Sequence, residues 1–97
     1  MADRIKLSTS EASSAVRTIK GKAQDAQNTV NNLQRDIRNV KNWWEGDSAV
    51  AFVDEFEKSK KEFDKMIECI SKYADLLSKA IEIQQKADAD IARQMRK

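Results

Sequence analysis

Apolar residues recur at every third or fourth position through the first half of the chain. Their steps alternate between four and three, which is the heptad pattern of a helix packed along a partner. The stripe comprises Ala12, Val16, Ile19, Ala23, Ala26, Val30, Leu33, Ile37, Val40 and Trp44. Ser8 and Glu11 precede it with the spacing of a capping box, in which a serine side chain accepts from the amide three residues on. We therefore predict a helix over about residues 8–45.

A second stripe with the same alternating steps runs through the second half of the chain. It comprises Ala49, Phe52, Phe56, Ser59, Phe63, Met66, Ile70, Tyr73, Leu77, Ala80, Gln84, Ala87 and Ile91. A flanking column with seven-residue spacing, interrupted only by Lys60, widens it with Val53, Ile67, Ala74 and Ile81. Between the two stripes, Gly46 can adopt the positive φ that ends a helix, and Asp47 or Ser48 can cap the next one. The pattern predicts a turn at 46–47 and a second helix over about residues 48–92.

Two long helices joined by a short turn predict an all-α fold, an antiparallel helical hairpin forming one domain over residues 1–97. A lone hairpin would leave part of its wide apolar stripe exposed, which monomers rarely tolerate. We therefore predict that it dimerises into a four-helix bundle. The pattern leaves open whether the partner is a second copy or a different chain, although identical pairs are commoner. The residues predicted to line the hairpin and dimer interfaces are Val30, Leu33, Ile37, Val40, Trp43, Phe52, Phe56, Phe63, Met66, Ile67, Ile70 and Leu77.

The composition argues against an enzyme. The chain has no histidine and a single cysteine, Cys69, so it lacks the residues of a Ser/His or Cys/His triad, a zinc cluster or an internal disulfide. We predict no catalytic, cofactor-binding or metal-binding residues and no cofactor. Cys69 borders the apolar stripe, where a small buried hydrophobe is its expected role. A net charge of +2 with interspersed acids and bases disfavours nucleic acid as a partner.

The chain also lacks the apolar segments that address proteins to membranes. Its first residues have no hydrophobic core of the kind found in Sec-type signal peptides. No run approaches the roughly 18 apolar residues of a membrane span, so we predict no stable membrane insertion. Taken alone, these features predict a cytoplasmic protein, although a leaderless export route would leave no mark at this level.

The triplet Trp44-Glu45-Gly46 lies in the middle of the chain, at the turn between two long amphipathic helices. In a protein of 97 residues, this arrangement resembles the WXG family, the ESAT-six-like substrates of Gram-positive type VII secretion systems. The resemblance implies that Trp44 and Gly46 form one half of a bipartite export motif. It also implies leaderless secretion and a role as a secreted effector or export adaptor. The implied partners are a second copy or a related WXG chain, the type VII secretion ATPase, and a larger secreted toxin.

The sequence departs from the family pattern at two points. Trp43 adds a second tryptophan, for which we favour packing against a partner helix. The other half of the family's export motif is Y-x-x-x-[DE] in the C-terminal tail, but the only tyrosine, Tyr73, is followed four residues later by Leu77. Either a partner chain supplies that half, or the export determinant differs.

Two alternatives remain open at this level. The chain could be a cytoplasmic helical adaptor or chaperone for a larger partner, with a chance W-x-G. It could also be a membrane-active amphipathic protein, although the polar face of its second helix mixes both charge signs instead of being basic.

Overall fold

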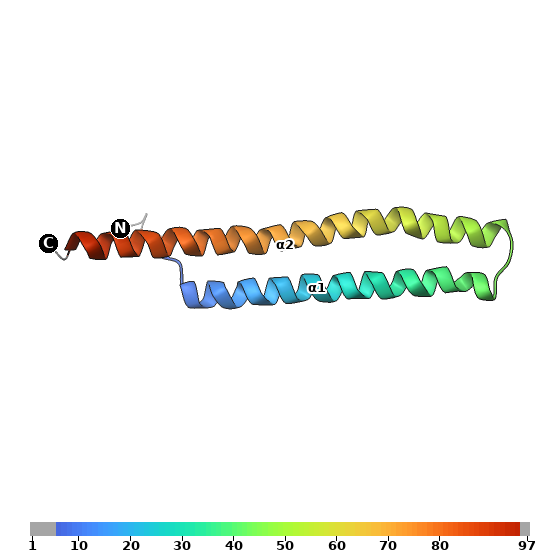
Figure 1. The fold of residues 1–97 in the computed structure, drawn as a ribbon, viewed down its shortest axis with the longest axis horizontal. Coiled ribbons are helices and arrows are strands. Elements are labelled where there is room, and N and C mark those ends of the chain that lie inside the picture. Colours follow the sequence, from blue (N-terminus) through green and yellow to red (C-terminus); the bar gives the residue numbers. More distant parts are fainter. Residues whose placement is uncertain (1–5, 96–97) are drawn as a thin grey trace.

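Two long antiparallel helices make up the computed structural model, which describes residues 6–95 (Figure 1). Helix α1 spans Thr9–Asn39, a short 3₁₀ helix η1 spans Val40–Asn42, and α2 spans Asp47–Met95. The molecule is a rod of 78 × 20 × 19 Å, and no strand occurs within residues 6–95. The predicted all-α helical hairpin is confirmed. Helix α2 continues well beyond the first residue of α1, so its C-terminal part has no helix beside it (Figure 1).

The ends of the helices follow from local chemistry. Ser8 caps α1, because its hydroxyl accepts a hydrogen bond from the Glu11 amide at 3.4 Å. After Asn39 the helix tightens into η1 and then stops, earlier than the predicted end at 45. Packed antiparallel helices have axes about 8–10 Å apart. The connection between them therefore takes residues 43–46, and not only the two residues of the predicted turn. Helix α2 begins directly after Gly46, whose carbonyl accepts from the Ala49 and Val50 amides.

Small side chains hold the two helices together. The buried apolar residues of the described chain are Ala12, Ala23, Val40, Ala49, Val53, Ala74 and Ile81. Four of these seven are alanines, and Ala74 is fully buried, which lets the helices approach closely. On α2, Val53, Ala74 and Ile81 belong to the column that was predicted only to flank the seam. That column is the face that α2 turns toward α1.

The phenylalanine-rich stripe of α2 lies beside the hairpin interface instead of at its centre. Phe52 and Phe63 are 42% and 40% exposed, while Met66 and Tyr73 are 62% and 67% exposed. This corrects the placement of Tyr73 on the core seam. The column of Val53, Ala74 and Ile81 faces α1 instead, and Ala74 within it permits close packing against the alanines of α1.

Candidate protein-interaction surfaces

The turn between the helices forms an aromatic tip. Trp44 is half-buried, and its ring centroid lies 5.5 Å from that of Phe52 in the first turns of α2. Trp43 stacks on Trp44 with centroids 6.5 Å apart, yet 71% of it is exposed. Trp44 thus packs against the start of α2 at the end of the hairpin. Trp43 points an aromatic surface at solvent.

The backbone conformation at position 46 favours glycine. Its φ is +109°, a conformation that residues with a Cβ rarely adopt, whereas an added Cβ would meet no atom within 4 Å. The constraint is therefore torsional and not steric crowding. The predicted positive φ at Gly46 is confirmed, and it sets the angle at which the two tryptophans precede α2.

The residues predicted to line the interfaces lie at different depths. Among them Val40 is buried, while the half-buried residues are Val30, Ile37, Phe56, Ile67, Ile70 and Leu77. The exposed ones are Leu33, Trp43, Phe52, Phe63 and Met66. Phe56 and Phe63 contact each other with ring centroids 6.5 Å apart. The hairpin therefore buries only part of the predicted set. Exposed and half-buried apolar residues follow one side of α2, and we call this side the lateral face. It comprises Phe52, Phe56, Phe63, Met66, Ile70, Tyr73 and Leu77.

Three further residues on the outer side of α2 were not predicted as surface features. Cys69 is exposed, which corrects its expected burial. Leu76 and Ile83 follow it at seven-residue spacing and are 65% and 61% exposed. The spacing itself was present in the sequence, but these residues fall outside both of the columns that defined the predicted seam.

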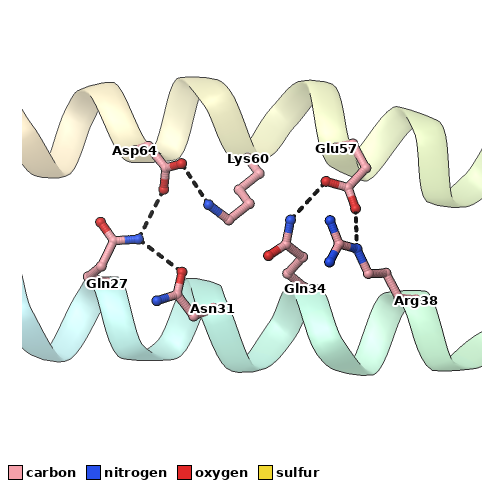
Figure 2. A network of polar contacts seen from close by, with 7 residues as sticks. All are labelled: Gln27, Asn31, Gln34, Arg38, Glu57, Lys60 and Asp64. Atoms are coloured by element: carbon pink, nitrogen blue, oxygen red, sulfur yellow. Dashed lines mark hydrogen bonds and ion pairs between the residues drawn. The ribbon is translucent and has the colours of Figure 1, made fainter.

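Two polar clusters join the helices (Figure 2). By helix periodicity, Glu57 and Asp64 lie on the other side of α2 from the lateral face. In the first, the Gln34 side-chain amide donates to a Glu57 carboxylate oxygen at 2.8 Å, and the Arg38 Nε donates to the other at 2.7 Å. In the second, Gln27 donates to Asp64 at 3.0 Å, and the Lys60 ammonium lies 2.7 Å from the same carboxylate.

These contacts lower the pKa of both carboxyl groups. The hydrogen bond from Arg38, and then that from Gln34, lowers the pKa of Glu57 below its usual 4.5. The hydrogen bond from Lys60, and then that from Gln27, lowers the pKa of Asp64 below 3.8. Because these partners lie on one flank of the hairpin, they favour the rotation of α2 that leaves the lateral face free.

Ion pairs of α2 form both within the helix and across the hairpin. Glu68 and Lys72 lie 3.7 Å apart within α2, whereas Glu57 turns to α1, and Asp75 pairs with Lys20 across the hairpin at 3.2 Å. Near Asp75 an open groove of about 580 Å³ lies between the helices. Within residues 6–95, no group of three or more His, Cys, Asp or Glu side chains could hold a metal ion. No helix in this part of the chain is long and apolar enough to cross a membrane.

Comparison with known proteins places the tip and the two helices in a family. The sequence profile of the WXG100 family, described as proteins of 100 residues with WXG, matches residues 4–89. Protein YukE of Bacillus subtilis (strain 168) is 31% identical over 96 residues, which cover 99% of each chain. No solved structure matches the chain significantly. The match spans both helices and the Trp44-Glu45-Gly46 turn, and the chain belongs to the WXG100 family.

Proposed function

We propose that this chain is a non-enzymatic protein secreted by a Gram-positive type VII system, acting as an effector or export adaptor through helix-mediated binding. Membership of the WXG100 family supports a small secreted protein of this type. The observation that carries the proposal is the aromatic tip, where Gly46 fixes the turn and Trp43 presents an exposed ring. Trp44 and Gly46 form the export motif, which the secretion ATPase reads together with features supplied by a partner. Before export the chain resides in the cytoplasm, and its route needs no cleaved leader.

The proposed active form is a homodimer, or a pair with a related WXG chain, packed as a four-helix bundle. The lateral face supports this assembly, because Phe52, Phe63 and Met66 remain 40–62% exposed in the single hairpin. A second hairpin laid along this face would bury those side chains at the centre of a bundle. A related WXG chain on this face would bring its own tail and so supply the Y-x-x-x-[DE] half of the export motif, which a second copy of this chain lacks as well.

Export is tested by comparing culture medium from producing strains with and without the type VII secretion ATPase. We expect the protein in medium only when the ATPase is present, and we expect Trp44→Ala to abolish its appearance while the cellular amount stays unchanged. Val50→Ala is the matched control, since Val50 is also an exposed apolar residue close to the tip, in the first turn of α2, but lies outside the Trp44-Glu45-Gly46 motif. Equal amounts in medium from both strains would refute secretion by this route.

Dimerisation is tested by light scattering on the purified protein. The double variant Phe63→Gln/Met66→Gln should shift the mass from dimer to monomer, because both side chains belong to the lateral face. Val50→Gln, which adds the same polar group to another exposed position of α2, should leave the dimer intact. A wild-type chain that stays monomeric at high concentration would contradict the proposed bundle.

A cytoplasmic adaptor is the second candidate. The absence of Y-x-x-x-[DE] after Tyr73 favours it, because half of the export motif is missing from this chain. The same secretion assay separates the two candidates, since an adaptor would be retained in cells whether or not the ATPase is present.

A further inference from the structure

The C-terminal half of α2 has a second apolar stripe that no part of the hairpin covers. It consists of Cys69, Tyr73, Leu76, Ala80, Ile83 and Ala87, with steps that alternate between four and three without a break. All six residues are exposed, and the large ones, Tyr73, Leu76 and Ile83, are 61–67% exposed. We call these six residues the outer stripe. Two columns of apolar residues with heptad spacing match the seam that a single partner helix covers.

A second hairpin on the lateral face would reach only part of the outer stripe, the column of Tyr73, Ala80 and Ala87 that continues from Met66. Successive residues of an α-helix are rotated by about 100° around its axis. Met66 therefore lies roughly 100° around α2 from Ile67, which faces α1. Cys69 lies roughly 160° from Ile67 in the same direction. Leu76 and Ile83 hold the same relation to Ala74 and Ile81. A second hairpin on the lateral face would therefore leave the column of Cys69, Leu76 and Ile83 at its rim.

One edge of the outer stripe is basic. Lys72, Lys79 and Lys86 form a column with seven-residue spacing directly beside Cys69, Leu76 and Ile83. Their acidic neighbours contact them only loosely at the surface, since Glu68 lies 3.7 Å from Lys72 and Glu82 lies 3.9 Å from Lys79. Exposed pairs of this kind exchange easily for pairs with an incoming partner. The other edge consists of Ile70 and Leu77 of the lateral face.

This charge pattern selects among possible occupants. A second copy laid antiparallel on the same stripe would bring one lysine column against the other, which disfavours self-association there. An anionic membrane would meet Glu68, Asp75 and Glu82 immediately behind the lysines, so the net attraction would be small. A helix with acidic residues along the edge of its apolar seam satisfies both the apolar columns and the lysines.

We propose that the outer stripe binds an amphipathic helix of another protein whose apolar seam is bordered by aspartate or glutamate. The proposal rests on the adaptor role given above and names the class of partner that the adaptor takes. In the dimer, the copy on the lateral face would leave Cys69, Leu76 and Ile83 free, and the foreign helix would bind along this column and its lysine edge. The two surfaces share Tyr73 but differ in their remaining large side chains.

The test uses two designed peptides of four heptads with the same leucine and alanine seam, one edged with glutamate and the other with lysine. We expect titration calorimetry to detect binding of the glutamate-edged peptide to the full-length protein, and at least tenfold weaker binding of the lysine-edged one. The bound peptide should also slow alkylation of Cys69, which lies within the stripe and is the only cysteine.

Two variants assign the contacts. The double variant Leu76→Gln/Ile83→Gln should lower the affinity of the protein for the glutamate-edged peptide at least tenfold, while Val50→Gln should leave that affinity unchanged. The triple variant Lys72→Glu/Lys79→Glu/Lys86→Glu should reverse the preference so that the lysine-edged peptide binds better. The matched control changes three exposed lysines elsewhere, Lys22→Glu/Lys41→Glu/Lys61→Glu, and should keep the original preference.

Several results would overturn the proposal. Equal binding of both peptides, or affinity that Leu76→Gln/Ile83→Gln leaves unchanged, would show that the outer stripe does not select this partner. Stronger association with phosphatidylglycerol vesicles than with the peptide would assign the stripe to a membrane surface. The dimer mass and the secretion assay are measured separately. A dimeric, exported protein that binds no peptide would therefore defeat this inference while leaving the proposed function standing.

Discussion

The two glycines of the chain provide a sharp test of what fixes the turn, because the same substitution should act in opposite directions. Gly21 lies inside α1, where alanine is the better helix former. Gly46 has a φ of +109°, where any Cβ is strained. At both positions an added Cβ meets no atom within 4 Å, so neither a new contact nor a clash contributes. The backbone conformation alone decides the sign.

The magnitudes follow from these two conformations. Gly21→Ala should raise the free energy of unfolding by about 1 kcal/mol, the difference in helix propensity between the two residues. Gly46→Ala should lower it by about 1–3 kcal/mol, the cost of holding a non-glycine residue at a positive φ. In a domain of this size, each kcal/mol corresponds to a shift of about 4–8 °C in melting temperature.

Urea denaturation followed by helical circular dichroism measures both effects. The wild type and the two variants are compared at one protein concentration, because dimerisation would add a concentration-dependent contribution. If both substitutions changed stability in the same direction, the turn would not depend on the φ of Gly46, and the conformational explanation of this motif glycine would be wrong.

Two other substitutions and one titration test the packing of the hairpin. Ala74→Leu should lower stability by about 1–3 kcal/mol, since Ala74 is fully buried between the helices, whereas Ala51→Leu on the exposed side of α2 should have little effect in the same melting experiment. Acid should destabilise the hairpin, because the pKa of Glu57 and that of Asp64 are lowered on folding from 4.5 and 3.8. The stability they contribute is present above those values and is lost as the pH falls below them. Arg38→Gln should make this loss smaller and complete it at a higher pH, because the folded-state pKa of Glu57 then lies closer to 4.5 while its unfolded value is unchanged. A pH series of urea midpoints would contradict this if acid destabilised the variant and the wild type by the same amount.

The hairpin could be predicted from the sequence because its determinants are local. The capping spacing of Ser8 and Glu11 identified the start of α1 within one residue, and Gly46 identified the turn. The sustained steps of three and four indicated two long helices. None of these features depends on what lies across the interface, so periodicity and local chemistry were sufficient.

The orientation of α2 about its own axis could not be predicted in the same way. Counting apolar side chains favoured the stripe of Phe52, Phe63 and Met66 as the inner face, but the structure places Val53, Ala74 and their column there. That choice depends on which face can approach the alanines of α1, and on Gln27 and Gln34 lying opposite Asp64 and Glu57. Both conditions require the register between the helices, which periodicity within one helix does not contain.

The candidate surfaces show the same division. The place of Trp44 and Gly46 at the turn could be predicted because their motif is contiguous, and the residues of the lateral face stood out because they follow the strongest stripe. Their roles in export and dimerisation stay predictions. Leu76 and Ile83 were missed because their column is apolar only from Cys69 onward. Earlier in α2 the same heptad position is occupied by Glu55 and Glu62. An apolar column that occupies only half of a helix changes the hydrophobic periodicity of the whole helix too little to be recognised from the sequence.

The distribution of side-chain sizes links the fold to the proposed assembly. The hairpin buries four alanines, each of which contributes little on burial, while most of the large residues of α2 remain at least partly exposed. Full burial of a phenylalanine or methionine side chain stabilises by about 1.5–3 kcal/mol, and the lateral face has several of these still to bury. A second hairpin on that face would bury the exposed fractions of these side chains and should therefore stabilise the fold further. The melting temperature should then rise clearly with protein concentration, by mass action, in scanning calorimetry over a hundredfold range. A concentration-independent melting temperature would mean that the alanine interface is sufficient and that the lateral face serves another partner.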